Sequence, residues 1–436
     1  MVTMKSAFVH IWGETAGAVA WDDENGLANF EFDEKFLRNG WNLSPLKMPM
    51  NSGKRVFAFP ELRKKRDSRY DCFKGLPGLL ADVLPDAYGN QLIDRWLAQQ
   101  GRPENSMNPV ETLCFIGTRG MGALEFEPAK FGSSNKAFNI EVDSLVEIAG
   151  KMLAKREGFE ANVRRDDEQA IRNILKIGTS AGGARPKAVI TYNEKSGQVK
   201  SGQTKAPKGF EHWIIKLDGV SDVQLGESFG YGRVEYAYYL MAGECGIEMM
   251  PSRLLEENGR AHFMTKRFDR EGPHTKHHIQ TLCAMKHYDY NDVNSYSYEQ
   301  LFQTMRELRL TYPEAEQMFR RMVFNVLSRN CDDHTKNVAF RLKKDKKWEL
   351  APAYDLCHAY RPDSEWVSRH ALSINGKRKG ITRNDLLVLA GSMNIKKASS
   401  IIDQVQSVVS RWAEFAERVN VEPKLRDAIS ETLLKV

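Results

Sequence analysis

The chain has 436 residues, enough for about two or three packed domains of ordinary size. Its 63 Lys and Arg residues against 57 Asp and Glu residues give a net charge of +6, which permits contact with nucleic acid without predicting it. A hydrophobic share of 42% and a charged share of 28% exclude a disordered tail protein. No apolar run approaches the roughly 18 residues of a membrane helix, and no signal peptide follows Met1, so we expect a cytoplasmic protein without a membrane partner.

The stretch before Pro109 is expected to mix strands and helices. Residues 8–12 and 18–21 are short strand-like runs, and the glycine-bounded segment between them indicates a hairpin. Apolar residues recur at helical spacing over residues 78–97, with an interruption at Pro85. The glycine-rich run at residues 117–122 is most simply a turn before a strand.

The rest of the chain divides by composition. Polar residues 131–136 are the best candidate linker, and a helix is expected from Val142 to about Lys155. A β-rich block follows over residues 171–270, and the remainder is helical apart from a hairpin at residues 338–350. The predicted domains are an N-terminal subdomain at residues 1–135, a β-rich region at residues 136–270 and a helical lobe at residues 271–436.

The strongest chemical signal is an acidic loop at residues 330–337. A capping-box pattern at Thr311 and Glu314 starts an amphipathic helix that is expected to end near residue 330. Asp332 and Asn337 then have the five-residue spacing of the catalytic Asp and Asn of protein kinases, and Asp355 follows the predicted hairpin. Phosphoryl transfer needs one carboxylate to accept a proton and an amide and a carboxylate to hold Mg²⁺. The alternative is that Asp332 and its neighbour only cap a turn. The predicted hairpin and Asp355 that follow favour the phosphoryl-transfer interpretation over this alternative.

Zinc is a weaker alternative for the same loop. Asp332, Asp333 and His334 are possible ligands, but consecutive residues cannot easily share one tetrahedral centre. His274, His277 and His278 lie in a stretch rich in Gly, Pro and Lys, so we expect them to be solvated and not metal-bound. The six cysteines are scattered without a C-x-x-C pair, which favours reduced, mostly buried thiols.

A second signal is the run of small residues at 178–187. Small residues with open amides can wrap a phosphate, although the run matches neither the Walker A pattern nor G-x-G-x-x-G. A third signal is Lys216, which stands among apolar residues of a predicted strand and is costly to bury unless paired. Glu235, at the start of a predicted helix, is its natural partner and would complete the kinase Lys–Glu pair. A strand over residues 263–268 then leads toward Arg270.

Together these motifs resemble the HipA family of bacterial serine/threonine kinases, the toxins of type II toxin–antitoxin pairs. The resemblance spans nearly the whole chain and includes Leu43–Met50 and Gly78–Asp86 in the N-terminal part. Its main motifs are S-A-G-G-A-R-P-K at residues 180–187, W-I-I-K ending at Lys216, K-R-F-D-R at residues 266–270, D-D-H-T-K-N at residues 332–337, and Tyr354–Asp355.

The resemblance implies an α+β, two-lobed protein-kinase-like fold with an extra N-terminal α/β subdomain. Asp332 and Lys216 would be catalytic, Asn337 and Asp355 would bind Mg²⁺, and Ser180 would be autophosphorylated, which would expel the loop and inactivate the kinase. The residues implied in ATP binding are Gly182, Gly183, Ala184, Arg185, Pro186, Lys187, Lys216, Lys266, Arg267, Phe268, His334, Thr335, Lys336, Asn337, Tyr354 and Asp355. Arg185, Pro186, Lys266 and Asp333 depart from the residues usual in the family.

The family also implies partners. A small helix-turn-helix antitoxin would neutralise the chain and bind operator DNA with it, and the protein substrate would be a translation protein such as an aminoacyl-tRNA synthetase. Basic runs at residues 63–66, 343–347 and 377–379 could touch DNA phosphates, although solvated faces explain them more simply. The competing interpretations are an inactive kinase-fold co-repressor and a kinase for a small molecule.

Overall fold

The computed structural model describes residues 4–64, 71–129, 137–153, 173–175, 177–178, 185–202, 205–220 and 230–436. Within these residues the chain forms two compact units. The first unit takes residues 1–43, 48–232 and 253–279, and the second takes residues 44–47, 233–252 and 280–436. The predicted boundaries at residues 135 and 270 stay predictions.

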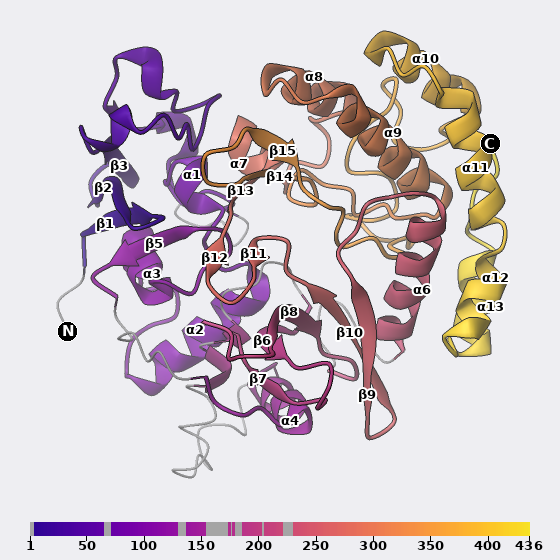
Figure 1. Cartoon of the computed structure of the whole chain (residues 1–436), viewed down its shortest axis with the longest axis horizontal. Helices are drawn as coiled ribbons and strands as arrows, with labels where there is room; N and C mark the ends of the chain where they lie inside the picture. Colours follow the sequence, from indigo (N-terminus) through magenta and orange to yellow (C-terminus); the bar gives the residue numbers. More distant parts are fainter. Residues whose placement is uncertain are drawn as a thin grey trace. The chain divides into compact units, whose positions relative to one another are not determined.

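The first unit begins with an antiparallel sheet in the order β4-β3-β2-β1-β5, seen at the indigo end of the chain in Figure 1. Its strands are β1 (Ser6–Ile11), β2 (Glu14–Asp22), β3 (Leu27–Phe32), β4 (Val56–Phe57) and β5 (Leu124–Glu127). The expected hairpin joins β1 to β2, and it turns at Trp12 and Gly13, which both have positive φ. A tight two-residue turn of this kind matches the twist of the strands it connects.

Three helices lie along the chain between β4 and β5 of this sheet. They are α1 (Gly78–Ala81), α2 (Ala87–Gln99) and α3 (Pro109–Ile116), and the predicted interruption near Pro85 separates the first two. The Asn108 side chain caps α3 by accepting a 2.8 Å hydrogen bond from the Glu111 N–H. The glycine-rich run after α3 is a turn that leads into β5, as predicted.

A second antiparallel sheet of the first unit has the order β7-β6-β8-β10-β9. Its strands are β6 (Lys187–Tyr192), β7 (Val199–Ser201), β8 (Glu211–Lys216), β9 (Ser252–Glu257) and β10 (Arg260–Lys266). Apolar residues of α2 and of α4 (Val142–Leu153) share one buried cluster with β6 and β8. A small hairpin, β11 (Arg270–Glu271) and β12 (Thr275–Lys276), follows β10.

The second unit is mostly helical, and its later elements carry the orange to yellow colours of Figure 1. A three-stranded sheet contains β13 (His278–Thr281), β14 (Ala339–Leu342) and β15 (Trp348–Leu350), and the last two form the predicted hairpin. The helices are α6 (Tyr231–Glu244), α7 (Leu282–Lys286), α8 (Tyr298–Glu307), α9 (Tyr312–Leu327), α10 (Arg383–Met393), α11 (Ala398–Val409), α12 (Trp412–Arg418) and α13 (Pro423–Ser430).

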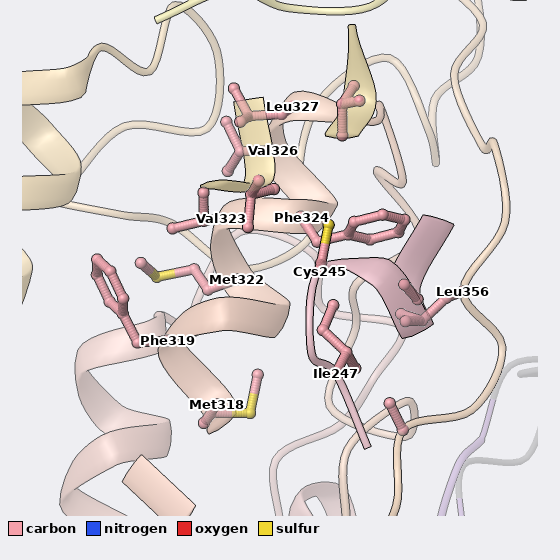
Figure 2. Close-up of a cluster of buried hydrophobic side chains, with 14 of the residues drawn as sticks. Cys245, Ile247, Met318, Phe319, Met322, Val323, Phe324, Val326, Leu327 and Leu356 are labelled. Carbon is pink, nitrogen blue, oxygen red and sulfur yellow. The ribbon is translucent and has the colours of Figure 1, made fainter. Parts of the chain in front are cut away.

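Helix α9 is the central element of this unit's core. Its apolar side chains, including Met318, Met322 and Phe324, lie in one buried cluster with Cys245 and Ile247 from the segment just after α6 (Figure 2). The predicted apolar stripe is therefore the buried face of α9. The helix ends at Leu327 rather than at residue 330, because Arg329 takes positive φ and turns the chain.

Candidate active site

The acidic loop begins where α9 ends, and local hydrogen bonds fix this junction. The Asn330 N–H donates to the Asn325 carbonyl at 2.9 Å after the turn at Arg329. The Tyr238 hydroxyl of α6 donates to the Ser328 carbonyl at 2.6 Å. The loop that carries the two aspartates is therefore anchored to the unit's core at its first residues.

The two adjacent aspartates lie in opposite environments. The Asp332 side chain is 49% exposed, and its Oδ1 lies 3.8 Å from His334 Nε2. The Asp333 side chain is only 2% exposed, and it accepts hydrogen bonds from the Tyr298 hydroxyl at 2.8 Å and the Ala371 N–H at 2.7 Å. Only Asp332 of the pair is thus accessible to an incoming hydroxyl group.

A buried polar cluster surrounds Asp333. His370 Nδ1 lies 2.9 Å from Asp333 Oδ2, and His370 Nε2 lies 3.8 Å from the Cys331 sulfur. Burial lowers the pKa of His370, but the Asp333 carboxylate outweighs it and raises that pKa to about 10. Asn325 extends the cluster by donating to the Tyr298 hydroxyl at 3.0 Å. The cluster ties α8 and α9 to the acidic loop and to residues 370–371.

This buried cluster is not predicted from the sequence. His370 lies 37 residues after Asp333, and no spacing rule connects them. From the sequence, Asp333 is a possible turn cap, a weak candidate zinc ligand and a departure from the residue usual in the family, but not the centre of a buried cluster. One feature of the sequence points to it: Asp333 is a second carboxylate shortly after an apolar helix. If such a carboxylate is buried, it must have a charged or hydrogen-bonding partner.

Asn337 is fixed to the loop by its own amide. Its Nδ2 donates to the Asp332 carbonyl oxygen at 2.7 Å, and its backbone N–H donates to the His334 carbonyl at 2.9 Å. The donor end of the amide is therefore engaged within the loop, and Oδ1 is the end suited to a cation. An amide oxygen and a carboxylate are ligands that Mg²⁺ accepts, so Asn337 and Asp355 fit this ion chemically.

Asp355 follows Tyr354 on a segment that is held from both sides. The Tyr354 hydroxyl donates to the Lys336 carbonyl of the acidic loop at 2.6 Å, and the Ala353 N–H donates to the Glu248 carbonyl at 2.8 Å. Asp355 has φ of 56°, an uncommon backbone conformation outside glycine that is often found at functional sites. These contacts connect Asp355 to the loop that bears Asp332.

The remaining loop residues have structural contacts of their own. The Thr335 hydroxyl donates to the Tyr288 carbonyl at 2.8 Å, and Lys336 Nζ lies 5.1 Å from the centre of the Tyr290 ring. The His334 ring also packs against Tyr290, with 5.2 Å between ring centroids. The part of the chain that the structure describes contains no group of three or more His, Cys, Asp and Glu residues placed to hold a metal.

In the first unit, Lys216 ends β8 directly opposite Lys187 on β6 and Phe263 on β10. Lys216 Nζ lies 5.8 Å from the centre of the Phe263 ring. Lys187 opens a strand instead of belonging to a loop, and its side chain is 5% exposed. Two lysines at the same end of neighbouring strands form a site of concentrated positive charge, which suits an anion.

The small-residue loop is described only at its two ends, Gly178 and residues 185–187. Ser180, Gly182, Gly183 and Ala184 lie outside the described residues. The Arg185 guanidinium lies 4.4 Å from the centre of the Tyr231 ring, and the Pro186 carbonyl accepts a hydrogen bond from the Leu217 N–H at 2.9 Å. The predicted pair of Lys216 and Glu235 joins residues of different units and stays a prediction; Glu235 is 4% exposed in α6.

The predicted adenine segment, Lys266, Arg267 and Phe268, follows directly from β10. Lys266 pairs with Glu211, whereas Arg267 is 1% exposed and donates to Asp269 through Nε at 2.9 Å. Burial raises the pKa of Asp269, but Arg267 and Arg270 outweigh it and hold that pKa well below its usual range. The Arg267 side chain is thus committed to a buried ion pair, and contact with a nucleotide at this residue would involve its backbone.

The expectation of solvated histidines is confirmed for His274, which is exposed, and is wrong for His277 and His278. Both side chains are buried, and His278 Nε2 lies 3.0 Å from the Leu43 carbonyl oxygen. Burial lowers the pKa of His278 to about 4. His278 opens β13, so pairing with the sheet overrides the polar composition of the preceding turn.

Comparisons with known proteins agree with this geometry. The family described as HipA N-terminal domain matches residues 7–127, and the family described as HipA-like C-terminal domain matches residues 179–412. The solved HipA of Shewanella oneidensis MR-1, in a complex with HipB and operator DNA, is 16% identical. It aligns with a TM-score of 0.65 over 99% of this chain and 100% of its own. "Putative kinase Y4dM" of Sinorhizobium fredii is 25% identical over 61% of this chain and 67% of its own length.

These matches show a two-lobed protein-kinase-like fold with an additional N-terminal part, as the sequence predicts. No helix among the described residues is both long and apolar enough to cross a membrane.

Proposed function

The chain belongs to the HipA family of kinase toxins, and from this premise we propose that it is an ATP- and Mg²⁺-dependent protein serine/threonine kinase. The observation that carries the proposal is the acidic loop of the second unit. There Asp332 is exposed, its carbonyl is held by Asn337, and the segment before Asp355 is bonded to the same loop through Tyr354. This set of groups is the one that phosphoryl transfer requires.

In this proposal Asp332 accepts the proton of the attacking hydroxyl group. Its half-exposed carboxylate supports the role, since Asp333 is enclosed and already accepts three hydrogen bonds. Asn337 and Asp355 would hold Mg²⁺, which would neutralise phosphate charge when bound.

The first unit would supply the nucleotide-binding residues. Lys187 and Lys216, opposite each other on β6 and β8, place two positive charges where phosphates could be bound. The other proposed nucleotide residues are Gly182, Gly183, Ala184, Arg185, Pro186, Lys266, Arg267, Phe268, His334, Thr335, Lys336 and Tyr354. Glu235 would support Lys216 as its ion-pair partner.

We further propose that Ser180 is autophosphorylated. A phosphate there would add a charge of about −1.5 to −2 within the small-residue loop. This charge would repel ATP and turn the kinase off. The partner of the chain would be a small helix-turn-helix antitoxin, and the pair would bind operator DNA, as the Shewanella complex of HipA, HipB and DNA suggests. The substrate would be a protein of translation, for example an aminoacyl-tRNA synthetase.

ATP turnover with Asp332→Asn tests the proposal. Loss of a general base lowers kcat by roughly 10²-fold or more, while ATP affinity should remain close to that of the unmodified chain. Asp345→Asn is the matched control, because Asp345 lies exposed in the β14–β15 turn and has positive φ, which Asn also tolerates. Equal turnover in the two variants would contradict the role of Asp332.

A further inference from the structure

The acidic loop at residues 331–336 alternates between buried and accessible side chains. Its odd-numbered side chains are buried, whereas the even-numbered ones, Asp332, His334 and Lys336, are partly exposed. Side chains two residues apart in an extended segment point to the same side. His334 Nε2 lies 3.8 Å from Asp332 Oδ1 on this side. The loop therefore presents an imidazole and an ammonium group beside the proposed general base.

One aromatic ring contacts both of these groups. Tyr290 lies in the segment between α7 and α8 and is partly exposed. Lys336 Nζ lies 5.1 Å from the centre of the Tyr290 ring, within the range of a cation–π contact. The centre of the His334 ring lies 5.2 Å from that of the same ring, at an interplanar angle of 49°. The Tyr290 ring therefore limits the positions open to both side chains.

The segment that carries Tyr290 is itself anchored. The Thr335 hydroxyl, on the buried side of the acidic loop, donates to the Tyr288 carbonyl at 2.8 Å. The Tyr288 ring stacks on Tyr296 with 4.4 Å between ring centroids, and the Asp289 N–H donates to the Tyr296 hydroxyl at 3.0 Å. Contacts that do not involve Lys336 therefore fix the backbone on both sides of Tyr290.

We propose that Tyr290 is a positioning residue, which holds Lys336 ready for the phosphates of ATP and so sets the affinity of the site for the nucleotide. The inference rests on the proposed kinase function, which places Lys336 in the nucleotide site. A lysine side chain is long and flexible, and fixing it when a ligand binds costs conformational entropy. Because the Tyr290 ring restrains the ammonium group before ATP arrives, part of this cost does not fall on binding.

The strength of the two contacts of Lys336 decides the direction of the effect. A hydrogen bond between an ammonium group and a phosphate carries charge on both partners, and it is stronger than the contact of an ammonium group with a partly exposed ring. The ring therefore guides Lys336 toward a phosphate and does not withhold it. Loss of the ring should weaken ATP binding, whereas a ring that competed with the phosphates would have the opposite effect.

Calorimetric titration of the phosphatase-treated whole chain with ATP and Mg²⁺ tests the role of the ring. Tyr290→Leu keeps an apolar side chain without an aromatic face, and we expect it to weaken ATP binding about fivefold, the loss expected for one cation–π contact. Tyr290→Phe keeps the ring and should bind ATP within about twofold of the unmodified chain. In phosphoryl transfer, Tyr290→Leu should raise KM for ATP more than it lowers kcat, since Asp332 is unchanged.

A second pair of variants shows whether Tyr290 acts through Lys336. In a Lys336→Met background the cation is absent, so Tyr290→Leu should weaken ATP binding by less than about twofold there. A tyrosine that only fills space beside the loop would cause the same loss in both backgrounds. Tyr312→Leu is the matched control, because Tyr312 is a partly exposed tyrosine at the start of α9, whereas the acidic loop follows the end of that helix. It should leave ATP binding unchanged.

The outcomes separate this inference from the proposed function. Equal ATP affinity in Tyr290→Leu and the unmodified chain would overturn the inference and leave the kinase function standing. A loss in Tyr290→Phe as large as that in Tyr290→Leu, or an undiminished loss in the Lys336→Met background, would do the same. Absence of both ATP binding and phosphoryl transfer in the unmodified chain would overturn the proposed function, and this inference with it.

Discussion

The two neighbouring carboxylates of the acidic loop lie in different surroundings and have different expected roles. Asp332 is open to solvent, whereas Asp333 lies in a buried cluster with Tyr298 and His370. Burial and Asp333 raise the pKa of Tyr298 well above its ordinary value, so its hydroxyl remains a neutral donor. The buried Asp333 carboxylate accepts three hydrogen bonds, which hold the backbone of this residue in place. Asp332 is the residue immediately before it. We therefore expect Asp333 to act as a positioning residue for Asp332.

Asp333→Asn should destabilise the chain because it leaves the charge of His370 buried without its partner. We expect the free energy of unfolding to fall by about 3–5 kcal/mol in urea denaturation. Adding His370→Gln to this variant should recover part of the loss, since the unpaired charge is then removed as well. Asp332→Asn is the matched control and should change stability by about 1 kcal/mol or less. Equal stability of Asp332→Asn and Asp333→Asn would contradict the buried pair.

The same pair predicts a dependence of stability on pH. His370 has an ordinary pKa of 6.5 and a folded-state pKa of about 10. Its contribution to stability is thus fully present below pH 6.5 and is lost as pH rises through 10. Unfolding free energies measured from pH 6.5 to 10 should fall in the unmodified chain and fall less in the double variant Asp333→Asn/His370→Gln. Parallel curves for the two proteins would count against the ion pair.

At the scale of single residues, the sequence predicts which side chains could do the chemistry, but it does not predict whether each one is buried or what it contacts. The spacing of Asp332 and Asn337 predicts a loop in which the structure joins the two residues through a hydrogen bond. Nothing in the spacing distinguishes the exposed Asp332 from the buried Asp333, because burial of Asp333 depends on a histidine 37 residues away. Asp355 likewise has an uncommon backbone conformation that its residue type does not predict.

Among the elements, α9 is the most important for the site because the acidic loop begins at its C-terminal end. Its capping box is confirmed: Glu314 accepts hydrogen bonds from the Thr311 N–H at 2.6 Å and from the Thr311 hydroxyl at 2.7 Å. The other Glu314 oxygen accepts the Leu350 N–H, which joins the helix start to β15. One carboxylate thus satisfies donors of two elements.

Glu314→Ala should therefore destabilise the chain by more than the loss of an ordinary surface charge. We expect a loss of about 1–2 kcal/mol in thermal or urea unfolding, the size of a lost helix cap. Glu316→Ala, two residues on, is the control, because Glu316 makes only a 3.7 Å contact with Arg320 one turn away. It should cost about 0.5 kcal/mol or less. A loss in Glu316→Ala as large as that in Glu314→Ala would refute this role of the cap.

Elements with a clear apolar period or a clear turn were predictable, and those set by distant contacts were not. The stripe of Met318 and Met322 predicts the buried face of α9, and the hairpin of β1 and β2 follows from its glycines. The sequence wrongly predicts a solvated His278, because the Gly, Pro and Lys residues before it are typical of the turn and not of the strand that His278 begins. Strand burial depends on neighbouring strands, which local composition does not contain.

At the scale of the whole molecule, the chain builds its two units from interleaved segments. Residues 233–252 belong to the second unit although the chain before and after them belongs to the first. Helix α6 contributes Val234, Tyr238 and Met241 to the core of the second unit, where Tyr238 packs edge-on against Phe324 at 5.9 Å between ring centroids. The C-terminal segment alone therefore lacks part of its own core.

This organisation predicts the behaviour of two fragments. A fragment of residues 280–436 should remain largely unfolded, with little dispersion in its amide NMR spectrum, because it lacks the apolar residues of α6. A fragment of residues 233–436 restores them and should show more helical circular dichroism per residue and a more cooperative melting curve. Cooperative folding of residues 280–436 alone would contradict the role of α6 in this core.

The central claim is that the chain transfers phosphate from ATP by means of Asp332. The most direct test is to treat the purified chain with a phosphatase, remove the phosphatase, add labelled ATP and Mg²⁺, and locate incorporated phosphate by mass spectrometry beside Asp332→Asn. We predict phosphate on Ser180 in the unmodified chain and none in the variant. Phosphate elsewhere would refute only the choice of Ser180. The same incorporation in the variant, or none in either protein together with no ATP binding, would contradict the claim.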